Sequence, residues 1–163
     1  MSLEYIALTA AILVLLVLSA FFSGSETALT GASLPRMHEL ARQGNRRAML
    51  VLALYEQRER LIGAILLGNN LANILATTLA TTAFIYLFGE AGVIYATVAM
   101  TSLVLVFAEV APKVYALANA DRMALGVAPV IRGIVFLFAP VTHAIQSLIG
   151  GVMKLFGVEQ GDN

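Results

Sequence analysis

Three short stretches of this sequence place polar side chains inside long apolar runs. They are SGSE at residues 23–26, GNNLAN at residues 68–73 and AEVAPK at residues 108–113. Together they supply hydroxyl, amide and carboxylate oxygens, and the chain contains no cysteine. Ligand sets made only of oxygen suit Mg²⁺, Ca²⁺ or Na⁺ better than Zn²⁺ or Cu⁺. The three stretches therefore predict a site for a hard cation.

The first stretch combines the carboxylate of Glu26 with the hydroxyls of Ser23 and Ser25. Carboxylates inside a membrane are rare and usually functional, but Glu26 could instead lie at the headgroups and cap the following helix. The two serines could simply bond back to their own helix backbone. We expect the helix to break at this stretch, and the break to line an ion site.

The second stretch contains three amides within one helical turn. Asn70 and Asn73 are three residues apart and Asn69 and Asn73 are four apart, so either pair shares a helix face. Amides in a membrane helix are costly unless each finds a partner. They either hold helices together through hydrogen bonds or direct their carbonyl oxygens into a cavity, and both interpretations stay open.

The third stretch places Glu109 directly after an uncharged run. Pro112 has no N–H, so the carbonyl of Ala108, four residues earlier, loses its helical partner. A carboxylate and a freed carbonyl would then lie together. The alternative is an ion pair between Glu109 and Lys113 at the end of the helix.

The composition indicates a membrane protein, because 60% of the residues are hydrophobic and only 12% are charged, against about 25% charged in soluble domains. We expect an all-α fold with transmembrane helices at about residues 3–34, 61–88 and 91–111. A straight span needs about 20 residues, so the first two must tilt, bend or break.

Residues 123–157 are apolar but contain Arg132 and two prolines, Pro129 and Pro140. We expect two juxtamembrane amphipathic helices at the cytoplasmic interface, with Arg132 and Lys154 reaching the headgroups. A hairpin that crosses the membrane is the alternative.

Basic residues predict the orientation, because cytoplasmic loops are enriched in them. Six of the ten Lys and Arg residues lie in residues 33–60, and the GEAG turn at residues 89–92 has none. We therefore expect the N-terminus outside and the C-terminus in the cytoplasm. The net charge is zero, which argues against nucleic-acid binding. Since no nucleophile–base pair or phosphate-binding loop is evident, we do not expect an enzyme.

The stretches FFSGSETALT, LLGNNLANI and FAEVAPKVYA resemble the transmembrane domain of the CorC and cyclin M (CNNM) family of magnesium transporters, over about residues 5–155. The resemblance implies a homodimer in the inner (plasma) membrane, with three transmembrane helices and a belt of juxtamembrane helices per subunit. It implies Mg²⁺ export coupled to Na⁺ entry, through a Mg²⁺ site in a cytoplasm-facing cavity. The implied Mg²⁺ ligands are Ser23, Ser25, Gly68, Asn70 and Glu109. Residues of the same motifs that would support this site or bind Na⁺ are Gly24, Glu26, Asn69, Asn73, Ala108, Pro112 and Lys113.

A stripe of small residues on the second span favours close approach of helices and, with the resemblance, a homodimer. Its members are Gly63, Ala64, Ala72, Ala76 and Ala80.

We expect residues 1–157 to form a transmembrane domain. Members of the family continue from this domain into a pair of cytoplasmic CBS domains that bind ATP. We expect residues 158–163 to be a linker and the CBS domains to have been removed by truncation. We therefore expect no ATP-binding site in this chain. The alternatives to a magnesium transporter are a membrane scaffold that regulates other magnesium transport systems, and a cation channel.

Overall fold

The computed structural model describes residues 2–158, and every regular element in that range is helical. Apart from Val158, the linker expected over residues 158–163 lies outside the described residues. The elements are α1 (Leu3–Gly31), α2 (Leu34–Arg42), α3 (Arg46–Glu56), α4 (Arg58–Phe88), η1 (Gly89–Ala91), α5 (Gly92–Leu103), η2 (Val104–Val110), α6 (Ala111–Ala118) and α7 (Ala120–Leu155).

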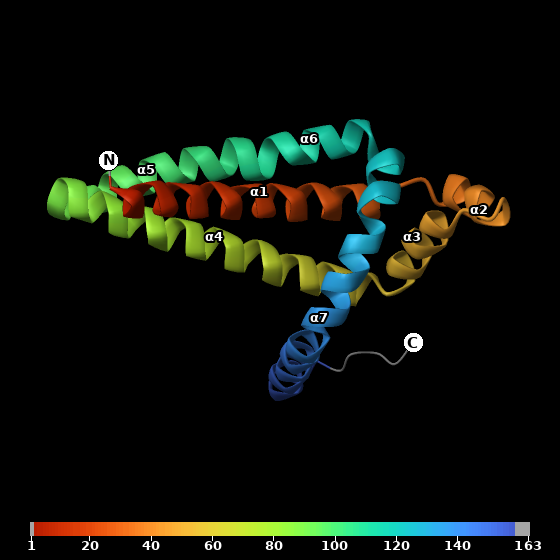
Figure 1. Ribbon diagram of the computed structural model, residues 1–163. Helices are drawn as coiled ribbons and strands as arrows, with labels where there is room; N and C mark the ends of the chain where they lie inside the picture. Colours follow the sequence, from red (N-terminus) through yellow and green to blue (C-terminus); the bar gives the residue numbers. More distant parts are fainter. Residues whose placement is uncertain (1, 159–163) are drawn as a thin grey trace.

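Three helical stretches are long and apolar enough to cross a membrane: α1, the stretch Arg58–Ala118 and α7. The middle stretch reverses direction at η1, so α4 and α5 pack against each other as a hairpin, while η2 and α6 diverge from α4 and pack against α1 (Figure 1). Gly89 has a φ of 67°, a conformation that glycine adopts without steric cost. The expectation of an all-helical protein with three long apolar helices is thus confirmed.

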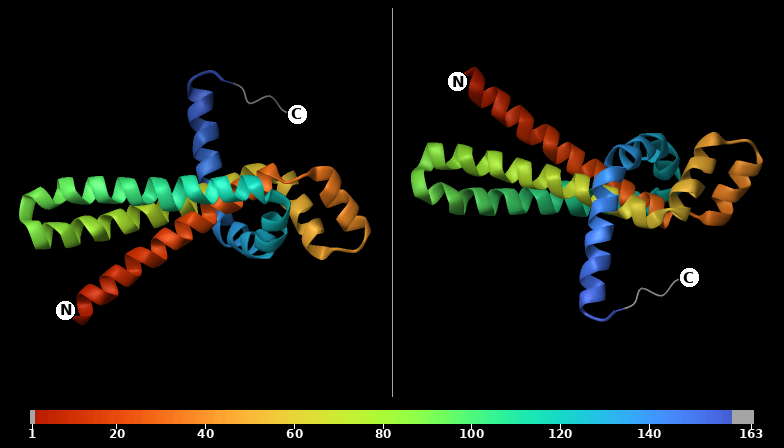
Figure 2. Two further views of the ribbon diagram at one scale, coloured as in Figure 1. Left: turned by 90° about the horizontal axis from the view of Figure 1, so that it is seen from above. Right: turned by 90° about the horizontal axis from the view of Figure 1, so that it is seen from below.

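The expected break in the first helix is wrong. Helix α1 runs without interruption through Ser23, Gly24 and Ser25, and Gly24 is not among the glycines with positive φ. An unbroken helix pairs its own backbone N–H and C=O groups, which lipid cannot hydrogen-bond. The extra length is taken up differently: α1 diverges from the α4–α5 hairpin toward its N-terminal end (Figure 2).

The irregular backbone lies instead in the expected third span, residues 91–111. The element η2 is a π-helix in which the N–H of Ala111 donates to the carbonyl of Val106, five residues earlier. Pro112 follows directly, and because it cannot donate a hydrogen bond, it disturbs the regular ladder at this point. Such π-segments are rare and frequently occur at functional sites.

Residues 123–157 were expected to form two helices at the cytoplasmic interface or a hairpin. Neither division of the segment is found, while its position at the interface stays a prediction. A single helix, α7, contains Pro129 and Pro140 in its interior. Proline can kink a helix without ending it, and α7 changes direction along its length (Figure 2). Helix α7 runs across α1 and α4 rather than along them (Figure 1), and it packs against α1, α3 and α4.

The larger apolar core lies where the end of α1 meets α2, α3, the start of α4 and α7. Its largest fully buried side chains are Leu29, Met37, Leu61, Ile65 and Ile131. A smaller cluster joins α4 to α5 through Ala76, Ala80 and Met100. One end of the molecule is therefore tightly packed, and the long helices extend away from it.

The small-residue stripe of α4 packs inside the chain and is not available to a second copy. Its four alanines are at most 4% exposed. At Gly63, an added Cβ would lie 2.8 Å from Cγ2 of Thr142 in α7. The stripe therefore explains how α4 approaches its neighbours within one chain, and it no longer supports a homodimer.

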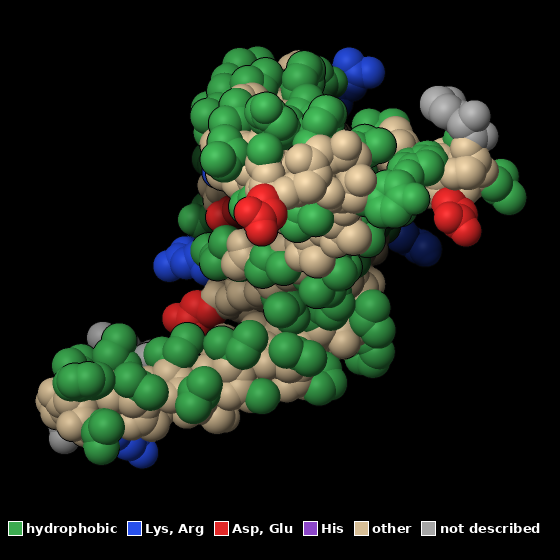
Figure 3. Space-filling model, turned by 90° about the vertical axis from the view of Figure 1, so that its left-hand side faces the viewer, with side chains coloured by type: hydrophobic (Ala, Val, Ile, Leu, Met, Phe, Trp, Pro, Cys, Tyr) green, Lys and Arg blue, Asp and Glu red, His purple; other side chains and the backbone are tan. Residues whose placement is uncertain are grey.

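The first half of α1 is largely exposed. The exposed fractions of Leu13, Val14 and Val17 are 57%, 59% and 67%, and the buried residues of α1 begin only at Ser19. Viewed from the end formed by the hairpin turn, apolar side chains cover much of the surface (Figure 3). Apolar surface on this scale needs a non-aqueous environment.

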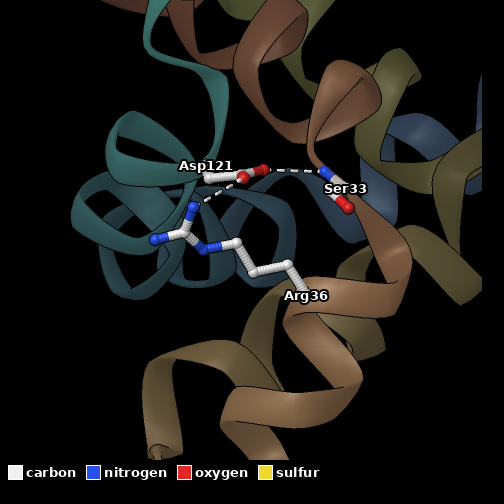
Figure 4. A network of polar contacts seen from close by, with 3 residues as sticks. All are labelled: Ser33, Arg36 and Asp121. Carbon is white, nitrogen blue, oxygen red and sulfur yellow. Dashed lines mark hydrogen bonds and ion pairs between the residues drawn. The ribbon is translucent and has the colours of Figure 1, made fainter.

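Asp121, in the first turn of α7, joins that helix to the connection between α1 and α2 (Figure 4). The backbone N–H of Ser33 donates to Oδ1 of Asp121 at 2.7 Å. Nη1 of Arg36 lies 3.8 Å from Oδ2, and the Arg36 side chain is 68% exposed. The short hydrogen bond therefore contributes more than the exposed ion pair, which we expect to be worth about 0–1 kcal/mol.

We expect Asp121→Ala to lower the free energy of unfolding by about 1–2 kcal/mol, because the Ser33 N–H loses its acceptor. Asp121→Asn keeps a carbonyl acceptor and removes only the charge, so it should cost less than about 1 kcal/mol. Thermal unfolding of the purified protein in detergent measures both. Equal losses in the two variants would show that the ion pair, not the hydrogen bond, secures this junction.

Candidate cation site

The three polar stretches meet around the buried half of α1. An added Cβ at Gly24 would lie 3.5 Å from both Cβ and the carbonyl oxygen of Pro112, which places the first stretch against the third. An added Cβ at Gly68 would lie 2.7 Å from the ring of Phe22, which places the second stretch against the first. The two glycines therefore mark close helix contacts, and Gly68 has no side chain to offer as a ligand.

The hydroxyls of Ser23 and Ser25 are buried and make no hydrogen bond with any described residue. Seven other helical hydroxyls behave differently, because they donate to the carbonyl four residues earlier. These are Thr27, Thr30, Thr81, Thr82, Thr97, Ser102 and Thr142. The interpretation that Ser23 and Ser25 only bond back to their own helix is therefore wrong. Buried polar atoms without a partner are uncommon and call for an explanation.

The three amides of α4 have three different environments. Oδ1 of Asn69 accepts a hydrogen bond of 2.6 Å from Oγ of Ser19, so this amide joins α4 to α1. Oδ1 of Asn73 is buried and has no partner. Asn70 is exposed on another face of α4. Interhelical bonding thus accounts for Asn69 but not for Asn73.

Glu109 lies in the π-helix η2 and is half-buried. No ion pair joins it to Lys113, which is exposed, or to any other described cation. The interpretation of Glu109 as one half of an ion pair at the helix end is therefore wrong. The neighbouring Ala108 is fully buried.

Glu109 and Asn73 line one hollow of about 350 Å³ between α4 on one side and α5 and η2 on the other. The hollow is also lined by three hydroxyls and several apolar side chains: Thr77, Thr97, Met100, Thr101, Val104 and Leu105. A carboxylate, an unpartnered amide oxygen and hydroxyls around one space can replace part of the hydration shell of a hard cation.

Asn70 lies apart from Glu109. It lines a different hollow, of about 760 Å³, between α4 and α7. Glu26 is half-buried in α1. Within the described residues, no three His, Cys, Asp or Glu side chains gather closely enough to hold a metal ion. A cation here would therefore depend on few charges and several neutral oxygens.

Two groups of polar residues were missed by the sequence analysis. Ser19 lies four residues before Ser23, on the same helix face, and that spacing could have drawn attention to it. Thr97 and Thr101 are also four residues apart and precede Glu109 on the same span. Because helical hydroxyls are common and usually bond to their own backbone, spacing alone does not separate these from ordinary ones.

The family model of the cyclin M transmembrane N-terminal domain matches residues 10–163. The chain belongs to the cyclin M (CNNM) transmembrane domain family. The resemblance of the three polar stretches to this family is thereby confirmed, and the match includes all of them.

Curated relatives of the family domain come from bacteria and plants. The chain is 38% identical over 142 residues to the UPF0053 inner membrane protein YfjD of Escherichia coli, covering 87% of this chain and 33% of that protein. It is 34% identical to a UPF0053 protein of Haemophilus influenzae, covering 91% of this chain and 35% of the relative. A chloroplastic DUF21 domain-containing protein of Arabidopsis thaliana is 36% identical, over 90% of this chain and 22% of its own length.

The chain thus spans about a third or less of the length of these relatives. The apolar helices and the inner membrane relative together indicate a multi-pass membrane protein.

Proposed function

We propose that this domain transports Mg²⁺ across the inner (plasma) membrane, as an exporter driven by Na⁺ entry. Mg²⁺ is the transported substrate and Na⁺ the coupling ion. The Mg²⁺ site lies between the three spans and opens toward the cytoplasm, and the domain has no enzymatic activity.

One observation supports this proposal most. Within residues 2–158, three buried side-chain oxygens have no hydrogen-bond partner, and all belong to the polar stretches of α1 and α4: Oγ of Ser23, Oγ of Ser25 and Oδ1 of Asn73. Leaving a buried polar group unpaired costs about 1–3 kcal/mol. A cation that binds these oxygens would offset that cost, and oxygen donors are the ligands that Mg²⁺ prefers.

Glu109 supplies the full charge at the proposed site. Ser23 and Ser25 supply hydroxyl oxygens and Gly68 a backbone carbonyl. Because Asn73 shares a hollow with Glu109 while Asn70 lines a different one, Asn73 replaces Asn70 as the amide ligand of the proposed site. Mg²⁺ keeps several of its waters in most protein sites, so binding on one charge is modest, which suits a carrier that must release its cargo.

A flux assay in liposomes tests the transport proposal directly. Purified protein is reconstituted, a fluorescent Mg²⁺ indicator is enclosed, and Mg²⁺ movement is followed with and without an opposing Na⁺ gradient. We expect Mg²⁺ flux only when Na⁺ can move in the opposite direction. Flux without a counter-ion would indicate a channel, and no flux from correctly folded protein would indicate a scaffold or regulator.

The N-terminus is outside and the C-terminus in the cytoplasm in this proposal. The chain has no cysteine, so single cysteines at Gln43, after α2, and Glu90, in η1, report on topology without background. In intact cells, an impermeant thiol reagent is expected to label position 90 but not position 43, because arginine-rich segments stay inside. Permeabilised cells, in which both positions should react, are the control. Labelling of position 43 alone from outside would reverse the topology.

The domain works as a homodimer in this proposal, on the strength of its family resemblance alone. The exposed apolar half of α1 leaves surface for a second copy or for lipid. Any ATP binding is assigned to cytoplasmic CBS domains, not to this domain.

A further inference from the structure

Two arginines from different helices face one hollow of about 480 Å³. Arg60 lies in the first turn of α4, and Arg132 lies near the middle of α7. Apart from these arginines and Gln57, the walls are apolar and come from α3 and α7: Met49, Leu50, Ala53, Leu54, Val135, Phe136 and Ala139. The hollow therefore combines two positive charges with an apolar wall.

Neither arginine forms an ion pair with a carboxylate within 4.0 Å in residues 2–158, and the carboxylates nearest to Arg60 in the sequence, Glu56 and Glu59, line a separate hollow that Arg60 also borders. Arg36 pairs with Asp121 and Arg42 with Glu39, while the guanidinium of Arg58 lies 5.5 Å from the ring centre of Tyr55. Arg60 and Arg132 have no such contact within residues 2–158. Two unpaired guanidinium groups around one hollow favour a ligand with negative charge, and arginine matches phosphate oxygens with paired donors.

The position of the hollow favours a ligand that is also apolar. Arg60 directly precedes Leu61, where the uncharged run of α4 begins. Next to Arg132 on α7, Phe136 and Leu137 are 83% and 70% exposed, as expected for side chains that face acyl chains. Basic pockets beside transmembrane helices are typical binding sites for lipid headgroups.

We propose that this hollow binds an anionic phospholipid. Its phosphate lies between Arg60 and Arg132, and the start of one acyl chain lies along the wall formed by α3 and α7. The bound lipid fills the angle between α7 and α4 and neutralises the two arginines at the membrane boundary.

Native mass spectrometry of the purified full chain tests the proposal. The protein is mixed in detergent with phosphatidylglycerol or with phosphatidylcholine, and the fraction that retains lipid is measured. Each arginine near an anionic lipid contributes roughly fivefold to binding. The double variant Arg60→Gln/Arg132→Gln is therefore expected to retain phosphatidylglycerol roughly 30-fold more weakly than the unmodified chain.

The double variant Arg46→Gln/Arg47→Gln is the matched control, because it removes the same charge from two arginines at the start of α3 that are exposed like Arg60 and Arg132 but do not line the hollow. It should retain phosphatidylglycerol like the unmodified chain. Equal losses in the two double variants would overturn the proposal, because general charge attraction would then explain the binding. Equal retention of phosphatidylglycerol and phosphatidylcholine by the unmodified chain would overturn it too.

Two further measurements complete the test. Displacement of phosphatidylglycerol by millimolar inorganic phosphate would show a site for free phosphate rather than for lipid. Ala53→Trp fills the apolar wall and leaves both arginines in place, so it serves if the arginine variant does not fold by circular dichroism and gel filtration. It should release phosphatidylglycerol, and unchanged retention would overturn the assigned acyl-chain position.

Discussion

Glu109→Gln is expected to abolish Mg²⁺ binding by the purified protein. The amide preserves the shape of the side chain but removes the one full charge that faces the hollow shared with Asn73. Two unit charges about 4 Å apart interact with about 4 kcal/mol at an effective dielectric constant of about 20. Since 1.4 kcal/mol corresponds to about tenfold in affinity, the loss should be about a thousandfold or more. Isothermal calorimetry with Mg²⁺ measures it.

Glu90→Gln is the matched control for this variant. It makes the same chemical change in η1, at the exposed turn of the hairpin, and it should leave Mg²⁺ affinity unchanged. Na⁺-driven Mg²⁺ flux in liposomes should be lost in Glu109→Gln and retained in Glu90→Gln. Unchanged Mg²⁺ affinity in folded Glu109→Gln would remove this carboxylate from the site.

The second large effect is expected from the serine pair of α1. Ser23→Ala/Ser25→Ala removes two buried hydroxyls that have no hydrogen-bond partner. A hydrogen-bond-strength contact between a charged and a neutral polar group is worth about 1.5–3 kcal/mol. If the two hydroxyls bind the cation, each therefore raises Mg²⁺ affinity by about tenfold or more. The double variant should therefore lose Mg²⁺ affinity by about a hundredfold or more, measured by calorimetry.

The same variant should be at least as stable as the unmodified protein without Mg²⁺, because removing an unpaired buried hydroxyl does not break a bond. Ser19→Ala is the matched control, four residues before Ser23 on the same helix face. It removes the donor to Asn69, so its free energy of unfolding should fall by about 1–3 kcal/mol. A loss of stability in the Ser23/Ser25 variant as large as that of Ser19→Ala would show that the pair is structural.

Local chemistry was enough to predict the class of the protein and the composition of its candidate site. Uninterrupted apolar runs of about 20 residues cross lipid as α-helices, so the long apolar runs indicated an all-helical membrane protein independently of its packing. The polar stretches stood out for the same reason, since each places costly groups in an apolar run. Their oxygen-only donor set also follows from composition alone.

The environment of each polar side chain depended on packing. Helical spacing places Asn69 and Asn73 on one face, but it does not say that Ser19 bonds to Asn69 and leaves Asn73 without a partner. Helical spacing also does not predict that Asn70 lines the hollow beside α7 rather than the hollow that contains Glu109. These differences arise because the rotation of α4 is set by contacts with α1 and α7, which are distant in the sequence.

The same dependence on packing explains the errors in the predicted backbone. Glycine and serine in SGSE permit a break, but α1 stays helical and Gly24 instead leaves room for Met123 of α7, whose Cε would lie 2.6 Å from an added Cβ. The irregular backbone lies in η2, where Pro112 follows, and Pro129 and Pro140 do not end α7. A residue type determines which backbone conformations are possible. Contacts between helices decide which one is adopted, because they determine where the backbone can find its hydrogen bonds and its neighbours.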